Sequence, residues 1–344
     1  MSEHLLDVQN LRVSFDTYAG EVQAVRGVSF YIDKGETLAI VGESGCGKSV
    51  SIQTVMGLLP MPPARIKEGH IYYEGKDLTT LTDKQMENYR GKEFSMIFQD
   101  SMTSLNPTMR VGRQMVEAIL VHQKISREEA REHAISLLGK VGLPEPEKVF
   151  KRYPHTMSGG QRVMIAMAMA CNPKILFADE PTTALDVTMQ AQILDLMNSL
   201  KKEMGTSILL ITHDLGVVAK MADRIAVMYA GKVVEYGDAR QIFYNPCHPY
   251  TWGLLGAMPN LIQEVKSELY AIPGTPPDLY APPKGCAFAA RCPYAMGACL
   301  KADPPEYTCS DGHISRCWLM DKRAKEVTPP DGVPTLPRGG KEHE

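Results

Sequence analysis

Residues 42–49 have the sequence Gly-Glu-Ser-Gly-Cys-Gly-Lys-Ser, and this stretch decides the fold. Its spacing, G-x-x-x-x-G-K-S, is that of a phosphate-binding loop. An apolar run at 37–41 precedes it, and Ile52, Val55 and Leu59 follow it on one face of a helical pattern. Strand, glycine-rich loop and helix form the context that such a loop requires, so a chance glycine-rich turn is the less favoured alternative. The chain is therefore predicted to bind a nucleoside triphosphate.

The residue types of this loop suit a triphosphate. Glycines allow the backbone to curl closely around the phosphates, with N–H groups and the positive end of the next helix pointing at them. We expect Lys48 to reach the β- and γ-phosphates and the Ser49 hydroxyl to bind Mg²⁺. The predicted nucleotide-binding residues of this segment are Gly42, Glu43, Ser44, Gly45, Cys46, Gly47, Lys48, Ser49 and Val50.

Length and composition limit the class of protein. With 344 residues the chain can form one large α/β domain and an appendage, and its net charge of -3 does not favour a nucleic-acid partner. The sequence has no apolar run of the ~20 residues that span a bilayer, and its start does not resemble a signal peptide. We therefore expect a cytoplasmic protein, in which the eight cysteines serve metal binding or catalysis rather than disulfides.

Polar residues follow three further apolar runs, which are predicted to be buried parallel strands. Gln99 follows residues 94–98, Asp179 and Glu180 end the run from 174, and His213 follows the run 207–211. The carboxyl ends of parallel strands meet at the ligand crevice of a sheet. Asp179 is predicted to hold Mg²⁺, Glu180 to polarise the attacking water, and His213 to hydrogen-bond the γ-phosphate. Gln99 is a candidate for contact with Mg²⁺ or the water, although it could equally be a turn residue, as His213 could be a loop residue.

Two other features have a functional and a structural interpretation. Phe15 and Tyr18 precede the loop in the sequence and could stack on a purine, but either is as readily a strand aromatic of the core. Ser158, Gly159, Gly160 and Gln161 precede an apolar helix at 163–170. They could present backbone N–H groups to an anion or simply cap that helix.

The order of these motifs resembles the ATP-binding cassette (ABC) family over residues 5 to about 240. The matching segments are the Walker A loop 42–49, Gln99, the signature 158–161, Walker B 174–180, the D-loop 184–186 with Asp186, and the switch residue His213. The resemblance implies a RecA-like core with an antiparallel β subdomain and an α-helical subdomain at about 100–165, within a cassette spanning 1–245. It places Phe15 at the adenine-stacking position. It also implies a head-to-tail dimer in which each ATP lies between one Walker A loop and the other signature.

A closer resemblance is to the ATPases of dipeptide and oligopeptide importers, in particular their D-type subunits. It is carried by residues 96–100, 104–107, 179–186 and 248–251. The resemblance implies a second, related ATPase, two membrane permeases, an extracytoplasmic binding protein and a place on the cytoplasmic face of the membrane. Nickel and other peptide-like importers share much of the pattern. A soluble ABC protein acting on DNA or ribosomes is less favoured, because the sequence shows no second cassette, coiled-coil insertion or strongly basic surface.

The signature departs from the family pattern. The family usually has two residues between the signature glycines and the Gln-Arg pair that begins the helix, whereas here Gly160 is followed directly by Gln161 and Arg162. A loss of two helical residues moves a helix start by about 3 Å and about 200°. We therefore expect a weakened ATP site between this signature and the Walker A loop of the partner ATPase.

The composition changes after residue 245, where a proline-rich segment leads to five closely spaced cysteines. Such a group in a cytoplasmic protein suggests soft-metal ligation, and four thiolates suit either zinc or a four-iron cluster. Zinc ribbons bring their ligands in close pairs, so the wide spacing favours the cluster. The resemblance implies a [4Fe–4S] cluster on Cys286, Cys292, Cys299 and Cys317, which leaves Cys309 as the spare. We predict an extension at 246–325 and a flexible tail at 326–344, with Cys171 and Cys247 as packing or surface residues.

Overall fold

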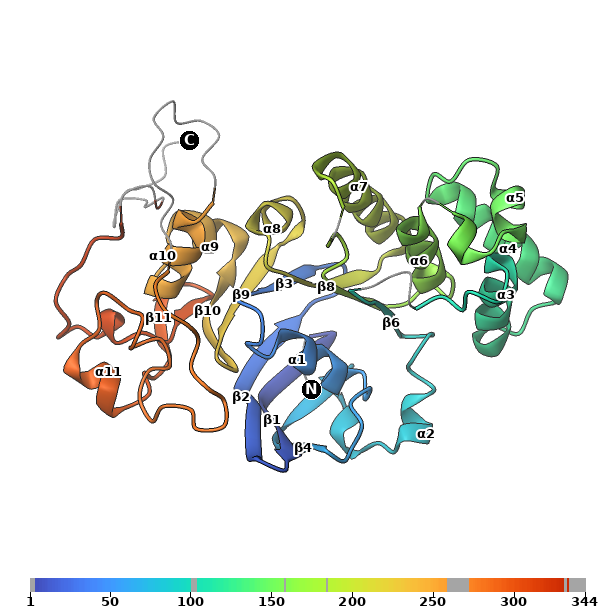
Figure 1. Ribbon diagram of the computed structural model, residues 1–344. Coiled ribbons are helices and arrows are strands. Elements are labelled where there is room, and N and C mark those ends of the chain that lie inside the picture. Colours follow the sequence, from blue (N-terminus) through green and yellow to red (C-terminus); the bar gives the residue numbers. More distant parts are fainter. Residues whose placement is uncertain are drawn as a thin grey trace.

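The computed structural model describes residues 4–99, 104–157, 159–183, 185–258, 272–330 and 333. Within these residues the chain forms an eight-stranded sheet and a four-stranded sheet, with helices packed against them (Figure 1). The predicted α/β class is confirmed, because parallel strands joined by helical segments make up the centre of the larger sheet. In the described part of the chain, no helix combines the length and apolarity needed to cross a bilayer.

The larger sheet has the spatial order β11-β12-β10-β9-β3-β8-β7-β6. The five strands from β9 to β6 are parallel, and β10, β12 and β11 continue the sheet with antiparallel pairing. The parallel strands are mostly apolar and buried, as expected where both faces of a sheet are covered. Their bounds are β3 Thr37–Val41, β6 Phe94–Ile97, β7 Ile175–Asp179, β8 Ser207–Thr212 and β9 Arg224–Tyr229.

The smaller sheet is antiparallel, with the order β2-β1-β4-β5, and lies below the larger one in Figure 1. The predicted strands at 6–15 and 22–32 are confirmed. Helix α1 (Lys48–Val55) lies between the two sheets, where Ile52 packs in one core with Phe30 and Phe177. The strand bounds are β1 Leu6–Thr17, β2 Gly20–Ile32, β4 Ala64–Tyr73 and β5 Lys76–Asp77.

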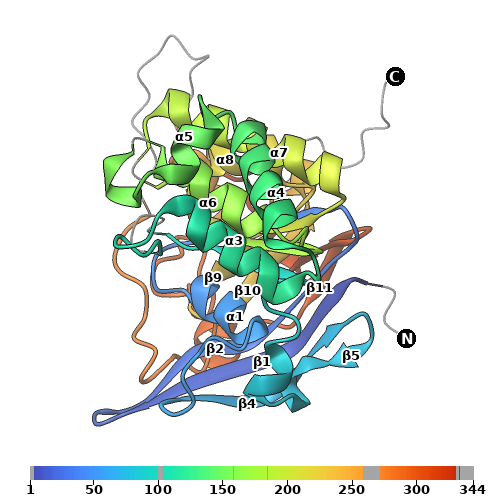
Figure 2. The same ribbon diagram turned by 90° about the vertical axis from the view of Figure 1, so that its right-hand side faces the viewer.

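A group of helices lies at the right-hand end of the molecule in Figure 1 and faces the viewer in Figure 2. The stretch predicted to be helical from 111 to 142 is two helices, because Ser126 begins the second one with a capping box. Its hydroxyl accepts from the Glu129 N–H, and the Glu129 carboxylate accepts from the Ser126 N–H. The helices of this group are α3 Val111–His122, α4 Arg127–Lys140, α5 Pro146–Lys151 and α6 Gly160–Met169.

Helices α7 (Val187–Met204) and α8 (Leu215–Met221) cover the face of the larger sheet that is turned away from α1. Successive residues of a strand point to opposite faces of the larger sheet. Leu176 packs with Met197 of α7, whereas Phe177 faces the core that contains α1. The remaining helices are α2 Asp83–Met86, α9 Ala239–Tyr244, α10 Pro249–Gly256 and α11 Gly297–Lys301.

The C-terminal extension adds two strands to the edge of the larger sheet. A hairpin of β11 (Tyr307–Ser310) and β12 (His313–Ser315) pairs with β10 (Lys232–Asp238). The sequence analysis expected a loop-rich segment here. Strands of three and four residues are too short to show an alternation of apolar and polar residues that would predict them. The extension also shares a hydrophobic cluster with the cassette, which joins Phe288 to Tyr229 and Tyr250.

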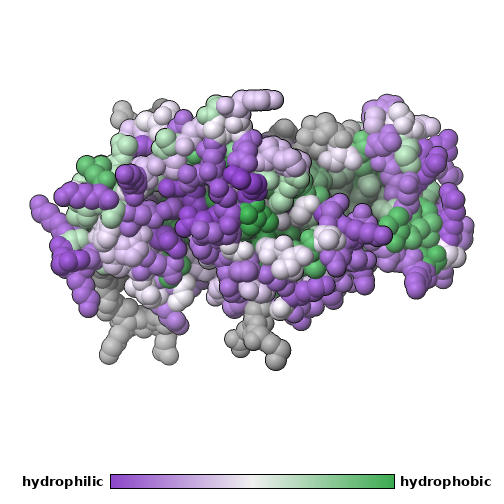
Figure 3. Space-filling view, turned by 90° about the horizontal axis from the view of Figure 1, so that it is seen from below, coloured by the Kyte–Doolittle hydropathy of each residue, from purple (hydrophilic) through white to green (hydrophobic). Residues whose placement is uncertain are grey.

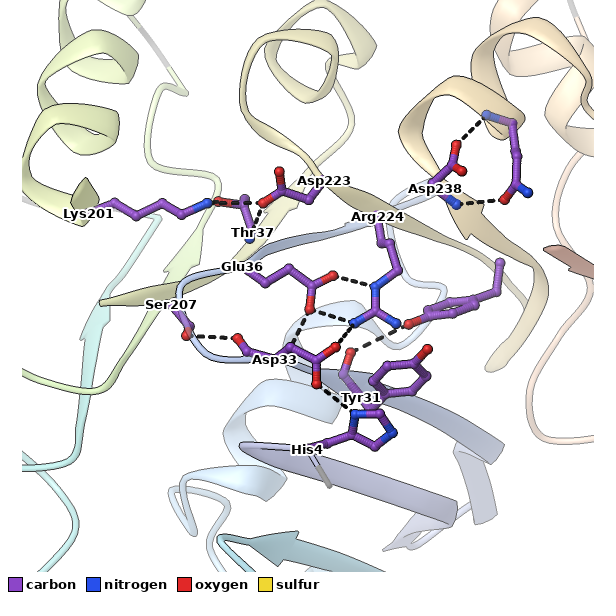
Figure 4. A network of polar contacts seen from close by, with 12 residues as sticks. His4, Tyr31, Asp33, Glu36, Thr37, Lys201, Ser207, Asp223, Arg224 and Asp238 are labelled. Carbon is purple, nitrogen blue, oxygen red and sulfur yellow. Dashed lines mark hydrogen bonds and ion pairs between the residues drawn. The ribbon is translucent and has the colours of Figure 1, made fainter. Parts of the chain in front are cut away.

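A polar network fastens the two sheets together at the amino end of the parallel strands (Figure 4). The Arg224 guanidinium is paired with the buried Glu36, donates to Asp33 at 3.1 Å and lies 3.8 Å from the ring centroid of Tyr31. His4 stacks on the same ring and contacts Asp33. Because Glu36 is buried, loss of its partner would leave an uncompensated charge.

We predict that Arg224→Met lowers the free energy of unfolding by about 3 kcal/mol, because Glu36 would keep its buried charge without a partner. The matched control is Arg65→Met, since the pair of Arg65 with Asp16 is half exposed on both sides and exposed pairs contribute less than about 1 kcal/mol. Urea unfolding curves measure both. Equal destabilisation by the two variants would contradict this account of the network.

Candidate nucleotide-binding site

The phosphate loop is held so closely that two of its positions accept only glycine. A Cβ on Gly42 would lie 2.1 Å from the carbonyl oxygen of Met228, and one on Gly47 would lie 2.4 Å from that of Ala24. The φ angle of Gly47 is 97°, in the left-handed region, and this residue precedes α1 directly. The Gly231 N–H donates to the Cys46 carbonyl at 3.0 Å, which ties the loop to the β9–β10 turn.

Lys48 and Ser49 are the first two residues of α1, directly after the loop. The Lys48 ammonium is buried and donates to the carbonyl oxygens of Gly42 at 2.7 Å and Glu43 at 2.9 Å. The Ser49 hydroxyl donates to Asp179 Oδ1 at 3.1 Å, so two of the predicted magnesium ligands are adjacent. Burial, with a smaller contribution from Glu180, raises the pKa of the Asp179 carboxyl. A divalent cation at this position would favour the charged form of Asp179.

The carboxylate of Glu180 is hydrogen-bonded to two other side chains that were predicted to be catalytic, Gln99 and His213. It accepts hydrogen bonds from Gln99 Nε2 at 3.0 Å, from Thr183 Oγ1 at 3.0 Å and from His213 Nδ1 at 3.1 Å. Burial raises the pKa of Glu180, but the hydrogen bonds from His213 and Thr183 outweigh it and keep the pKa below its ordinary value. Glu180 is therefore ionised and able to accept a proton from water. Thr183 lies within the family pattern at 179–186, but the sequence analysis gave it no role at the site.

The bond to Glu180 restricts the proton state of His213. A carboxylate only accepts, so Nδ1 of His213 carries a hydrogen in this contact. Nε2 of a neutral ring is then an acceptor. The imidazole must rotate or take up a second proton before it donates to a phosphate. The side chain is mostly exposed, which leaves room for either change.

The signature is described only in part. Gly159 has a φ of 114° and precedes α6, whereas Gly160 is already the first, buried residue of that helix. The Gln161 amide donates to the Pro181 carbonyl, next to Walker B. Ser158 and Ala184 lie outside the described residues, and Asp186 caps α7 by accepting from the Met189 N–H at 2.9 Å.

Phe15 is half buried on β1, in register with Val22 on β2 and Ala64 on β4. Tyr18, the second aromatic, is fully exposed in the turn after β1. Stacking of Phe15 on the purine stays a prediction.

A link between the extension and the phosphate loop was not foreseen from the sequence. Arg291 donates to both carboxylate oxygens of Glu43, at 2.7 and 2.9 Å, and is itself buried. The Tyr250 hydroxyl accepts from the Glu43 N–H at 2.8 Å. The sequence analysis used Tyr250 only as part of the family pattern at 248–251 and gave Arg291 no role, because their shared partner is 207 and 248 residues away along the chain. Glu43 is thus neutralised at the mouth of the loop by a residue adjacent to Cys292.

The four cysteines predicted to bind a cluster lie near one another. Burial, with a smaller contribution from the nearby Cys299, raises the pKa of Cys286 and of Cys292 to about 11. Cys317 is raised as well, by burial and then by the other three thiols. Their sulfur atoms do not converge within 4.8 Å of one another as ligands of a single ion would.

Comparison with known proteins agrees with this geometry. The model of the ABC transporter family matches residues 25–183, and that of the oligopeptide/dipeptide transporter C-terminal region matches 234–299. The chain is 60% identical to the oligopeptide transport ATP-binding protein OppD of Bacillus subtilis, over 96% of this chain and 92% of that protein. This chain belongs to the oligopeptide/dipeptide family of ABC transporter ATP-binding proteins.

Other relatives agree. The dipeptide transport ATP-binding protein DppD of Bacillus subtilis is 57% identical over 94% of this chain and 97% of that protein. Among solved structures, a post-hydrolysis dimer of the cassette MJ0796 bound to ADP and Pi matches with a TM-score of 0.61 and 28% identity. The match covers 68% of this chain and 99% of that one. The predicted ABC cassette fold and ATPase class are confirmed.

The face of the molecule seen from below is largely hydrophilic (Figure 3). Figure 3 shows that hydrophilic side chains cover most of the face seen from below, with hydrophobic ones gathered in a few small groups. Among the exposed hydrophobic residues, Val121 at the end of α3 and Tyr153 belong to the helical group. Larger apolar surfaces would mark a bilayer or a permanent interface.

We predict that Arg291→Met weakens MgATP binding about tenfold. Without the guanidinium the Glu43 carboxylate would repel the triphosphate, and a tenfold change corresponds to about 1.4 kcal/mol. The double variant Arg291→Met with Glu43→Gln removes that charge and restores affinity to within about threefold of the parent, as measured by nucleotide titration calorimetry. An unchanged affinity in Arg291→Met, or no recovery in the double variant, would contradict the electrostatic role.

Proposed function

We propose that this ATPase powers the uptake of di- or oligopeptides through membrane permeases. The peptide cargo is supported by the names of the relatives and by the match to the C-terminal region of peptide transporters. The energy source is supported by one observation above all. Glu180, the residue placed to activate water, is hydrogen-bonded to Gln99 and His213 and adjoins Asp179, the partner of Ser49.

The chain's own groups account for hydrolysis. Lys48 and the loop amides hold the triphosphate, and Ser49 and Asp179 hold the Mg²⁺ that comes with it. Glu180 takes a proton from the attacking water, and Lys48 and His213 stabilise the charge that develops on the γ-phosphate. Gln99 leaves Glu180 when the site fills, which makes it the residue that reports nucleotide state to a permease.

The proposed assembly follows the family arrangement. This chain forms a heterodimer with a second, related ATPase, and the pair binds two membrane permeases that receive peptide from an extracytoplasmic binding protein. The assembly places the chain peripherally on the cytoplasmic face of the membrane. Its support is the sequence similarity to the peptide-transport ATPases and the dimeric state of the related cassette structure.

The test of this function compares Lys48→Ala and Glu180→Gln in vesicles carrying the permeases and the second ATPase. Lys48→Ala should lose MgATP binding, whereas Glu180→Gln should keep binding and lose at least about 100-fold in ATP hydrolysis and peptide uptake. Glu306→Gln, a half-exposed glutamate paired with Arg316, is the matched control. Undiminished nucleotide affinity in Lys48→Ala, or peptide uptake that persists without hydrolysis, would refute the proposal.

The shortened signature is proposed to weaken one of the two ATP sites of the heterodimer. Gly160 is already helical, so Gly159 is the one signature glycine that precedes α6. Two residues inserted after Gly160 should raise the ATPase rate of the assembled transporter severalfold, because the signature amides would meet the partner's ATP in the usual geometry. An unchanged rate and unchanged uptake would show that the preceding loop compensates.

We propose that Cys286, Cys292, Cys299 and Cys317 hold a [4Fe–4S] cluster with a structural role. Its support is the match of the chain to the C-terminal region of peptide transporters and the presence of the four cysteines within one short extension, where their sulfur atoms do not all lie within 4.8 Å of one another. Protein purified without oxygen should be brown and contain about four irons per chain. This iron should be lost in Cys292→Ser and kept in Cys171→Ser, and iron-free protein from the parent chain would contradict the cluster.

A further inference from the structure

A second group of metal-ligating side chains lies at the joint between the cassette and the extension. Cys247 precedes α10, Cys309 lies on β11 and His313 lies on β12. One ligand atom from each residue falls within 4.8 Å of the other two. The sequence analysis interpreted Cys247 as a packing or surface residue and left Cys309 as a spare. No link between them was expected, because 62 residues separate them along the chain.

His313 is oriented as a ligand would be. Its ring is fully buried, and Nε2 lies 2.8 Å from Oε1 of Glu235, which is fully buried as well. The other nitrogen, Nδ1, is buried and has no hydrogen-bond partner in the described part of the chain. Metal-bound histidines are usually held in this way, with one nitrogen fixed by a carboxylate and the other left for the ion.

Glu235 is held in place by more than the imidazole. Its two oxygens accept from the backbone N–H groups of Cys247 at 2.6 Å and His248 at 3.0 Å. The same carboxylate therefore positions the histidine ligand and the backbone of a cysteine ligand. Its pairing partner Ser315 on β12 lies two residues beyond His313, so the sheet register brings the three segments together.

We propose that Cys247, Cys309 and His313 form a zinc site that fastens the C-terminal hairpin to the cassette. Two thiolates and one imidazole suit a soft or borderline ion, and Zn²⁺ takes such ligands at about 2.0–2.3 Å in tetrahedral geometry. Ligand atoms around such an ion are about 3.3–3.8 Å apart, so a small inward movement closes the site. The two thiols lose their protons to water on binding, and Cys247 gives up its weak contact with the Asn245 carbonyl.

The three residues supply three of the four zinc positions. Cys309 is partly buried, whereas His313 and Cys247 are buried, and a water molecule would complete the four ligands of the zinc. The site is distinct from the four-cysteine group, which shares none of its residues. Its effect is to join the segment before α10 to the β11–β12 hairpin, and so to hold the extension that carries Arg291.

The experiment titrates Zn²⁺ into the full-length chain, purified anaerobically in a reductant and stripped with a chelator, against a chromophoric zinc indicator. The variants are Cys309→Ser and Cys247→Ser, with Cys171→Ser as the matched control at a partly buried cysteine after α6. The parent and Cys171→Ser should bind one zinc more per chain than the other two, or bind it at least 100-fold more tightly. Any zinc that the four-cysteine group binds is the same in all four proteins, so it does not contribute to the difference in zinc stoichiometry between them.

Thermal melting with and without Zn²⁺ shows whether each variant folds. The parent and Cys171→Ser should melt at a higher temperature with zinc, whereas Cys309→Ser and Cys247→Ser should melt as the metal-free parent does. Equal zinc stoichiometry and affinity in all four proteins would overturn the proposal. So would a Cys247–Cys309 disulfide, recognised by a mass two hydrogens lower, in the freshly purified parent chain.

Discussion

The close contact of the phosphate loop with the backbone of its neighbours is the constraint on which the rest of the structure depends. Gly42 lies against the Met228 carbonyl and Gly47 against that of Ala24, so the loop is held by strands of both sheets. Any side chain at either glycine would force these strands apart. The curl of the loop, and with it the site for a triphosphate, therefore exists only when the two sheets are correctly packed.

The parallel sheet brings the catalytic groups to that loop. Its order β3-β8-β7-β6 places the ends of four adjacent strands at one edge, and these ends lead to the loop, His213, Glu180 and Gln99. The hydrogen bonds that converge on Glu180 show that the strand ends meet at one point. Charged groups also gather at the opposite, amino end of the parallel strands. The Arg224 network stabilises the amino end, where it does not compete with phosphate.

The extension packs against the cassette and shares its central sheet. It supplies two strands to the central sheet, an aromatic cluster around Phe288, and the arginine that neutralises Glu43 in the phosphate loop. Arg291 therefore links the extension directly to the phosphate loop. A metal-stabilised extension would keep this contact in place in a segment that has few apolar residues of its own.

The sequence by itself determined the phosphate loop, the parallel strands of the cassette and the polar residues that follow them. These signals are local, since a glycine spacing, an apolar run and the polar residue that ends it all lie within about ten positions. Only the tertiary structure decided the partners that are distant in sequence. Arg291 meets Glu43, Glu235 meets His313, and Cys247 meets Cys309 across intervals that leave no periodic trace. Such contacts depend on how sheet edges and loops pack, and single residues carry no pattern from which this packing follows.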